Sequence, residues 1–334
     1  MLSRAATSLA LLGRHLERAD HLARILGVHV ALSLDRTDEP GPEFWIRFME
    51  LAGWPGSNTG RRDQAVEMLV TGTLGPSVGA SVGAARLAAQ AVRPSLPSEL
   101  YEQVNALHWR VQEGAWQPDL YPFLNDVQLS VRLVDGLLED TMLHDEARDF
   151  VRVGKFLERA GNVTALVTRK AAELADEGSP RTHGAAAEFV GLTPEGTLEW
   201  TAVLKSCFAF ESYQARYSGG VTPEHVIECL LLDAALPRSA RFAAAVALES
   251  VTRIDGAGRR SQPRRVLRRL ESMFESAEPQ WVASNAREFE TQCRALLRQL
   301  EAAMRETYFH PSKVPAGVLG EEGQAMPQQQ QQRT

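Results

Sequence analysis

The sequence predicts an all-α protein, an internally duplicated helical bundle with a pseudo-two-fold repeat. Strands are not expected, because no segment alternates apolar and polar residues with β-branched enrichment between tight turns. Apolar residues instead recur every three or four positions, the spacing that places side chains on one face of a helix. In addition, segment 12–19 (LGRHLERA) returns as segment 153–160 (VGKFLERA), with Gly, a basic residue, Leu and Glu-Arg-Ala in one register.

The first half of the chain is expected to open with a long helix over residues 2–32, in which Leu9, Leu12, Leu16 and Val30 share one apolar face. Residues 35–42 are rich in acids and proline and should end it. The further helices predicted in this half cover residues 43–52, 61–71, 77–92, 98–113 and 121–144.

The second half is expected to begin with a helix over residues 145–175, which carries the second Glu-Arg-Ala run. A polar connection over 176–196 follows, and then helices over 197–217, 223–235, 238–254, 263–276 and 280–308. We therefore predict two helical halves, residues 1–150 and 151–310, packed as one unit. Residues 311–334 are expected to form a disordered tail, because this glutamine-rich segment has too little apolar surface to bury.

Other matches extend the repeat. Residues 66–69 with Pro76 match residues 227–230 with Pro237, 161 positions later. Trp45 and Trp200 lie 155 positions apart, and the two Glu-Arg-Ala runs lie 141 apart. The offsets increase along the chain, as expected for two homologous halves that differ by loop insertions.

The composition excludes several classes of protein. The 36 basic and 42 acidic side chains give a formal net charge of −6, so we expect no general attraction to nucleic acid or to an anionic membrane. Cys207, Cys229 and Cys293 are far apart, which argues against a zinc knuckle, a redox motif or a disulfide framework. No run approaches the ~18 apolar residues of a spanning helix, and no cleavable leader is evident. These features predict a soluble, cytoplasmic protein.

Polar residues on the first helix are the main candidates for chemistry. At the helical repeat, Arg14, Glu17, His21 and Arg24 fall on one stripe. The simplest interpretation is a solvated face with an Arg14–Glu17 contact. The second copy, with Lys155, Glu158 and Arg159, indicates a more important role, because a solvated face has little reason to repeat. A structural alternative is that each glutamate pairs with an arginine of a neighbouring helix.

Metal and nucleophile chemistry is not expected. His15 and His21 correspond to Phe156 and Asn162, so no histidine is shared by the two copies, and the chain contains no Glu-x-x-His motif of di-metal bundles. A Walker-type motif is also absent from the sequence, and Gly79 and Gly83 fall within a predicted helix, where they are interpreted as packing glycines. We therefore predict no metal and no cofactor. The basic cluster over residues 259–269 is interpreted as a solvated loop and helix start, because no aromatic residues are interleaved for base stacking.

An ordered set of short motifs resembles the bacterial alpha-E family of all-helical proteins. The motifs that carry the resemblance are Met1-Leu2-Ser3-Arg4, Gly13 to Ala19, Pro76-Ser77-Val78 with Arg86 and Arg93, Ser98-Glu99 with Glu102 and Asn105, Thr141-Met142 with Asp145-Glu146, Gly154 to Ala160, and Pro237-Arg238-Ser239. The resemblance spans residues 1–310. It implies a protein that works beside a circularly permuted ATP-grasp ligase, often with a transglutaminase-like peptidase, in amide or peptide metabolism.

The resemblance and the repeat together suggest roles for individual residues. Glu17 and Glu158 are predicted to act catalytically, by orienting an amine or accepting its proton. An arginine clamp would bind a carboxylate or phosphate, since a guanidinium offers a planar two-toothed fork. The predicted substrate-binding residues are Arg14, Arg18, Arg159, Arg238, Glu99 and Glu146.

Three functions stay open at this point. The first is a helical partner of the ATP-grasp ligase, with a cleft for the ligase or for a peptide-like or amino-acid-like substrate. The second is an enzyme that acts on an amide or peptide by itself. The third is a non-catalytic scaffold in which the Glu/Arg motifs only tie helices together.

Overall fold

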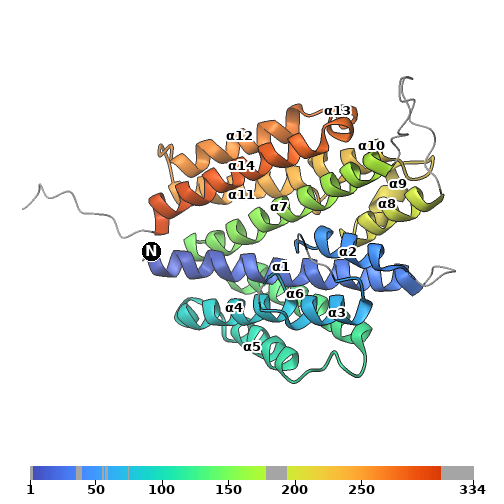
Figure 1. The fold of residues 1–334 in the computed structure, drawn as a ribbon. Helices are drawn as coiled ribbons and strands as arrows, with labels where there is room; N and C mark the ends of the chain where they lie inside the picture. The colour runs from blue at the N-terminus through green and yellow to red at the C-terminus, as the bar shows by residue number, and fades with distance from the viewer. Residues whose placement is uncertain are drawn as a thin grey trace, which may run out of the picture.

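Two 32-residue helices, α1 (Ser3–Leu34) and α7 (Glu146–Glu177), run side by side through the middle of the molecule (Figure 1). The computed structural model describes residues 3–34, 40–54, 56, 59–73, 75–177 and 194–309, and these residues contain helices and no strands. The all-α prediction is therefore confirmed. The predicted tail over 311–334 and most of the connection over 176–196 lie outside the described residues.

The remaining helices lie on both sides of this central pair. They are α2 (Pro42–Leu51), α3 (Arg62–Thr71), α4 (Val78–Ala91), α5 (Ser98–Gln112), α6 (Leu120–Thr141), α8 (Pro194–Ser206), α9 (Phe210–Arg216), α10 (Pro223–Ile227), α11 (Ala240–Asp255), α12 (Gln262–Ser276), α13 (Pro279–Ser284) and α14 (Ala286–Met304). Short helical turns cover Arg93–Ser95, Glu228–Leu232 and Arg305–Phe309. Most helix boundaries predicted from the sequence agree with these within a few residues.

The order of helix contacts on the α1 side recurs on the α7 side. α1 packs against α4 and α6, while α5 joins α4 to α6. α7 packs against α11 and α14, while α12 joins α11 to α14. In Figure 1 the two sets lie below α1 and above α7. Their apolar side chains form one continuous core with those of the central pair.

Side-chain caps explain why several helices begin where they do. The hydroxyl of Ser77 accepts a hydrogen bond from the N–H of Ala80 at the start of α4, and Ser239 does the same for Phe242 at the start of α11. Each cap satisfies one of the N–H groups that a helix leaves free at its first turn. The serines of the two Pro-containing motifs thus fix where α4 and α11 begin against the central pair.

The helix predicted over residues 197–217 is interrupted at Phe208, so that this prediction is wrong there. Phe208 has a left-handed backbone with φ of 52°, and the N–H of Ala209 bonds to the carbonyl of Leu204 at 3.0 Å. This is a Schellman cap, whose left-handed position is usually glycine. A non-glycine residue there costs roughly 1–2 kcal/mol, so local sequence gives no sign of the turn. The helix predicted over 280–308 is likewise divided, at Asn285 between α13 and α14.

The crossing of α1 and α7 depends on two glycines. A methyl group on Gly13 would overlap the carbonyl group of Val151, and one on Gly154 would overlap that of Ala10. The relation is reciprocal, because each glycine contacts the residue that lies three positions before the other glycine. The two backbones can therefore approach this closely only because neither glycine carries a side chain.

The expectation that the polar stripe of α1 is a solvated face is wrong. α1 is covered by α4, α6, α7 and α8, and Glu17, His21 and Arg24 are all buried. Arg14 does not contact Glu17 but forms an ion pair with Glu301, in which Nη1 of Arg14 lies 3.0 Å from Oε1 of Glu301. The stripe lies between helices, where its charges need partners.

None of the helices in the described residues is long and apolar enough to cross a membrane.

Candidate functional site

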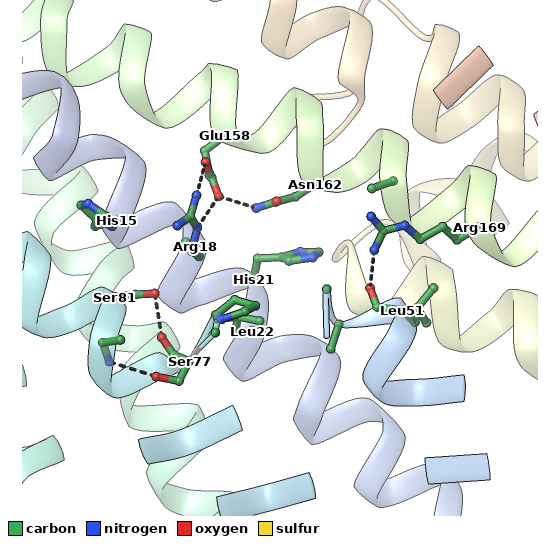
Figure 2. A pocket seen from close by; sticks show the side chains of 16 residues that line it. His15, Arg18, His21, Leu22, Leu51, Ser77, Ser81, Glu158, Asn162 and Arg169 are labelled. Carbon is green, nitrogen blue, oxygen red and sulfur yellow. Dashed lines mark hydrogen bonds and ion pairs between the residues drawn. The ribbon is translucent and has the colours of Figure 1, made fainter. Parts of the chain in front are cut away.

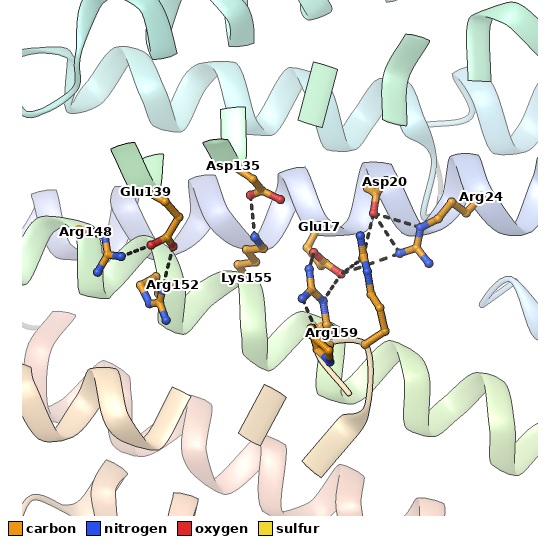
Figure 3. Close-up of polar contacts among 11 residues, drawn as sticks. Glu17, Asp20, Arg24, Asp135, Glu139, Arg148, Arg152, Lys155 and Arg159 are labelled. Carbon is orange, nitrogen blue, oxygen red and sulfur yellow. Dashed lines mark hydrogen bonds and ion pairs between the residues drawn. The ribbon is translucent and has the colours of Figure 1, made fainter. Parts of the chain in front are cut away.

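Glu17 of α1 and Arg159 of α7 form an ion pair that is closed to solvent, which we name the sealed pair. Two parallel hydrogen bonds of 2.8 and 2.6 Å join the guanidinium to the carboxylate (Figure 3). The side chains are 2% and 6% exposed. Burial alone would raise the pKa of Glu17, but Arg159, Arg238 and Lys155 outweigh it and hold that pKa well below its usual range. Glu17 is therefore a fixed anion with no access to a substrate in this conformation.

Further charges surround the sealed pair. Arg24 bonds to the carboxylate of Asp20 at 3.1 Å and to the carbonyl of Ser206. Arg238 lies 3.7 Å from Glu17 and 3.5 Å from Asp20. Burial, together with Arg159 and Arg24, lowers the pKa of Arg238. We name these five residues the sealed group: Glu17, Asp20, Arg24, Arg159 and Arg238. The sealed group contains three guanidiniums and two carboxylates, so it holds an excess of positive charge inside the bundle.

The reciprocal pair, Arg18 of α1 and Glu158 of α7, reaches the surface, and we name it the open pair. Its two hydrogen bonds are 2.7 and 3.1 Å long (Figure 2). Asn162 donates to the same carboxylate at 3.4 Å, and the guanidinium of Arg14 lies 3.8 Å from it. The side chain of Arg18 is 36% exposed and that of Glu158 is 10% exposed. Each glutamate therefore pairs with an arginine of the other copy, as the structural alternative predicted, but the two pairs differ in access.

Two cavities meet at the open pair. Cavity A, of about 410 Å³, lies between α1, α7 and the turn before α4, and cavity B, of about 560 Å³, lies between α1, α7 and α14. Arg18, Glu158 and Asn162 line both. Arg18 uses Nε and Nη2 for Glu158, and no residue in the described ranges bonds to its Nη1. A ligand could therefore meet a free guanidinium N–H group and a carboxylate side by side.

Cavity A contributes uncharged imidazoles next to these charges. His15 and His21 of α1 line it, together with Ser77 and Ser81 of the α4 end (Figure 2). Burial, together with the charges of Arg18 and Arg14, lowers the pKa of His15 to about 4. Burial and Arg24 lower the pKa of His21 to about 3. Both side chains are neutral near pH 7, so each can donate one hydrogen bond and accept another.

The buried histidines predict a specific loss of stability in weak acid. His29 also has a pKa lowered to about 4, by burial and by Lys170. In the unfolded chain a histidine binds its proton near pH 6.5, so below that pH the unfolded state gains protons that His15, His21 and His29 do not bind in the folded state. The free energy of unfolding has its full value above about pH 6.5. It should fall as the pH drops below that value, by up to about 1.4 kcal/mol per pH unit for each histidine.

Urea unfolding of wild type and His21→Gln between about pH 7 and pH 5 measures this effect. The variant should lose stability with falling pH about two thirds as steeply as the wild type, because His15 and His29 keep their lowered pKa values. Equal slopes for the two proteins would show that His21 titrates in the fold as it does in the unfolded chain.

Cavity B combines arginines with apolar side chains. Arg14 and Glu301 both line it and form an ion pair of 3.0 Å, and Arg298 lines the wall that α14 provides. Leu297 and Met304 cover part of the same wall. This wall suits a ligand that carries both a negative charge and an apolar group.

The predicted site residues do not form one site. Arg14, Arg18 and Glu158 lie at the cavities, whereas Glu17, Arg159 and Arg238 belong to the sealed group. Glu99 and Glu146 are exposed at the starts of α5 and α7, and neither lines cavity A or B. The basic cluster over 259–269 lies around the start of α12, and most of its arginines are exposed.

Two polar residues of the site, Asp20 and Asn162, were not selected from the sequence, and Arg24 was named only as part of the polar stripe of the first helix. Asp20 and Arg24 contact each other one helical turn apart, and Asn162 lines both cavities. The spacing of Asp20 and Arg24 was a usable signal. Asn162 gave none, because its place in the repeat is taken by His21 in the other copy. Among the described residues, no group of three or more His, Cys, Asp or Glu could hold a metal ion.

Comparison with known proteins gives the family. A family profile named Alpha-E, described as a predicted alpha-helical domain with a conserved ER motif, matches residues 1–309. The chain belongs to the Alpha-E family. The sequence contains Glu-Arg only at residues 17–18 and 158–159, so the ER motif of the Alpha-E description corresponds to the sealed and open pairs.

The curated relatives are longer than this Alpha-E chain. The uncharacterized protein Rv2567 of Mycobacterium tuberculosis and the uncharacterized protein Mb2597 of Mycobacterium bovis are each 24% identical to it over 331 residues. These alignments cover 91% of the Alpha-E chain and 36% of each relative. The chain thus spans about a third of the length of these relatives. No solved structure matches it.

Proposed function

We propose that this Alpha-E protein is a cytoplasmic helical partner of an ATP-grasp amide ligase and that the open pair binds an amino-acid-like or peptide-like substrate. The observation that carries the proposal is the open pair itself, an Arg18–Glu158 ion pair at the junction of two cavities. Arg18 would bind a carboxylate or phosphate through its free Nη1, and Glu158 would accept a hydrogen bond from an amine. Asn162 and the neutral His15 would orient the uncharged part of the substrate.

The sealed pair receives a different role in this proposal. Glu17 and Arg159 would hold α1 against α7 and keep the open pair in register, although the repeat alone suggested catalysis by both glutamates. The support is burial, since the carboxylate of Glu17 is 2% exposed and that of Glu158 faces two cavities.

We also infer that the two halves arose by duplication, with one Glu–Arg pair closed and the other left open. The reciprocal glycine contacts, the crossed Glu–Arg pairs and the matching order of helix packing support this inference. Under the duplication, the neighbours of the two pairs have diverged. Arg24 and Arg238 close one pair, while Asn162 and His15 line the cavity at the other.

A partner protein is supported by the length of the relatives. In each of them, the segment similar to this chain is part of a protein nearly three times as long. A domain that is joined to further sequence in its relatives is a natural candidate for association with a second unit. The ligase as that unit comes from the family resemblance.

Reconstitution with a circularly permuted ATP-grasp ligase of the same organism tests this function. ATP, the common amino acids and the ligase are incubated with or without the Alpha-E protein, and ADP and new amides are measured. The protein should increase both products at least tenfold, and Arg18→Gln or Glu158→Gln should abolish the increase. Arg268→Gln, an exposed change on α12, serves as the charge-matched control and should behave as wild type. A ligase that is fully active alone would contradict the proposal.

A further inference from the structure

A third cavity, cavity C, lies where the second half of α1 meets α6 and α8. Its volume is about 350 Å³, and none of its lining residues is shared with cavity A or B. Arg24, Arg132 and Lys205 line it, and none of its lining residues within the described part of the chain is acidic. This is unusual on a protein whose overall charge is −6.

The positive charges of cavity C are not neutralised within the described ranges. Arg24 pairs with Asp20, but the sealed group behind it contains one more guanidinium than carboxylates. No carboxylate of the described residues forms a salt bridge with Arg132 or Lys205; both contact aromatic rings instead. An anion in this cavity would therefore be attracted by two exposed cations and by the buried excess charge.

An aromatic ring forms the wall between these charges. The guanidinium of Arg132 lies 4.1 Å from the centre of the Phe208 ring, and those of Arg24 and Arg238 lie 5.1 and 5.3 Å from it. Phe208 holds its left-handed backbone at this point although glycine would fit it without strain. Strained residues that persist often mark ligand sites, and the ring here is positioned by three cations.

The rest of cavity C is mixed in character. Asn125 and Gln128 of α6 contribute amides that have no hydrogen-bond partner among the residues described. Leu124 and Leu198 give it apolar surface, and the side chain of Leu198 remains partly exposed. Its volume is in the range of small-molecule sites.

We infer that cavity C binds a small organic anion, whose carboxylate or phosphate meets Arg132 and Lys205 and whose apolar part lies against Phe208 and Leu198. The amides of Asn125 and Gln128 would bond to the polar atoms next to the charge. This site is independent of the open pair, because it shares no residue with cavities A and B.

Ligand-observed NMR with three probes tests the inference on the full chain. 3-Phenylpropionate and phenyl phosphate carry the two candidate anions, and 3-phenylpropanol is the neutral match. Both anions should bind and the alcohol should not. Arg132→Gln/Lys205→Gln should weaken the binding of the anions at least tenfold, because two charge-assisted contacts are lost. The control Arg62→Gln/Arg268→Gln removes two exposed charges elsewhere and should bind as wild type.

The outcomes separate the alternatives. Binding of only one anion would identify the carboxylate or the phosphate as the preferred group and would support the site. Equal binding of the alcohol, equal weakening by the control variant, or no binding of any probe would overturn the inference. Glu158→Gln should leave this binding unchanged, so a failure of the ligase proposal would not affect the result.

Discussion

Gly154→Ala is expected to destabilise the protein by about 3 kcal/mol or more, the upper range for overpacking a core. The added methyl group would overlap the carbonyl of Ala10, and Gly13→Ala would overlap that of Val151 in the same way. Backbone atoms of a helix cannot rotate away as a side chain can, so α1 and α7 would have to separate. Urea unfolding of Gly154→Ala and Gly13→Ala beside wild type measures the cost.

Two other helical glycines serve as controls for this prediction. Gly83 of α4 and Gly136 of α6 have no atoms within 4 Å of the position of a methyl group. Alanine is the better helix former by about 1 kcal/mol, so Gly83→Ala and Gly136→Ala should be neutral or stabilising. If Gly154→Ala resembled these controls, the close crossing of α1 and α7 would be contradicted.

Glu17→Gln is expected to cost about 3–5 kcal/mol, the range for breaking a buried ion pair by removing one partner. The amide cannot neutralise Arg159, and the sealed group would then hold three guanidiniums against the single carboxylate of Asp20. Glu158→Gln removes the same charge from the open pair, where water reaches Arg18, and should cost about 1 kcal/mol or less.

Chemical unfolding of the two glutamine variants in one buffer decides between these costs. Arg159→Met in the Glu17→Gln background should recover part of the loss, since it removes the uncompensated charge. Comparable costs for Glu17→Gln and Glu158→Gln would mean that burial does not distinguish the two pairs, and the separate roles proposed for them would fail.

Much of the fold could be predicted from the sequence, because long amphipathic segments have a strong helical period. The predicted starts of α4 and α11 lie at or next to Ser77 and Ser239, the residues that cap these helices. The turn at Phe208 was not predictable, since a left-handed phenylalanine is stabilised by arginines from α1 and α6 and from the segment before α11. Such tertiary contacts leave no local signal.

The candidate site was predicted only in part. The repeat identified both Glu-Arg runs, but the periodicity of one helix could not show that neighbouring helices bury most of the polar stripe of α1. For that reason Glu17 and Glu158 looked equivalent. Whether a glutamate is sealed or open depends on its neighbours, and Arg238, which helps to close the pair of Glu17, comes from a distant part of the chain.

The central claim is that the open pair binds a ligand, while the sealed pair holds the helices together. It is tested most directly by Arg18→Glu/Glu158→Arg, which exchanges the two charges and keeps an ion pair between α1 and α7. Unfolding and ligase-dependent amide formation are measured on the same preparation. We predict a folded protein, within about 1 kcal/mol of wild type, that no longer supports product formation. A folded variant with full product formation would contradict the claim and would make the open pair a tie between helices.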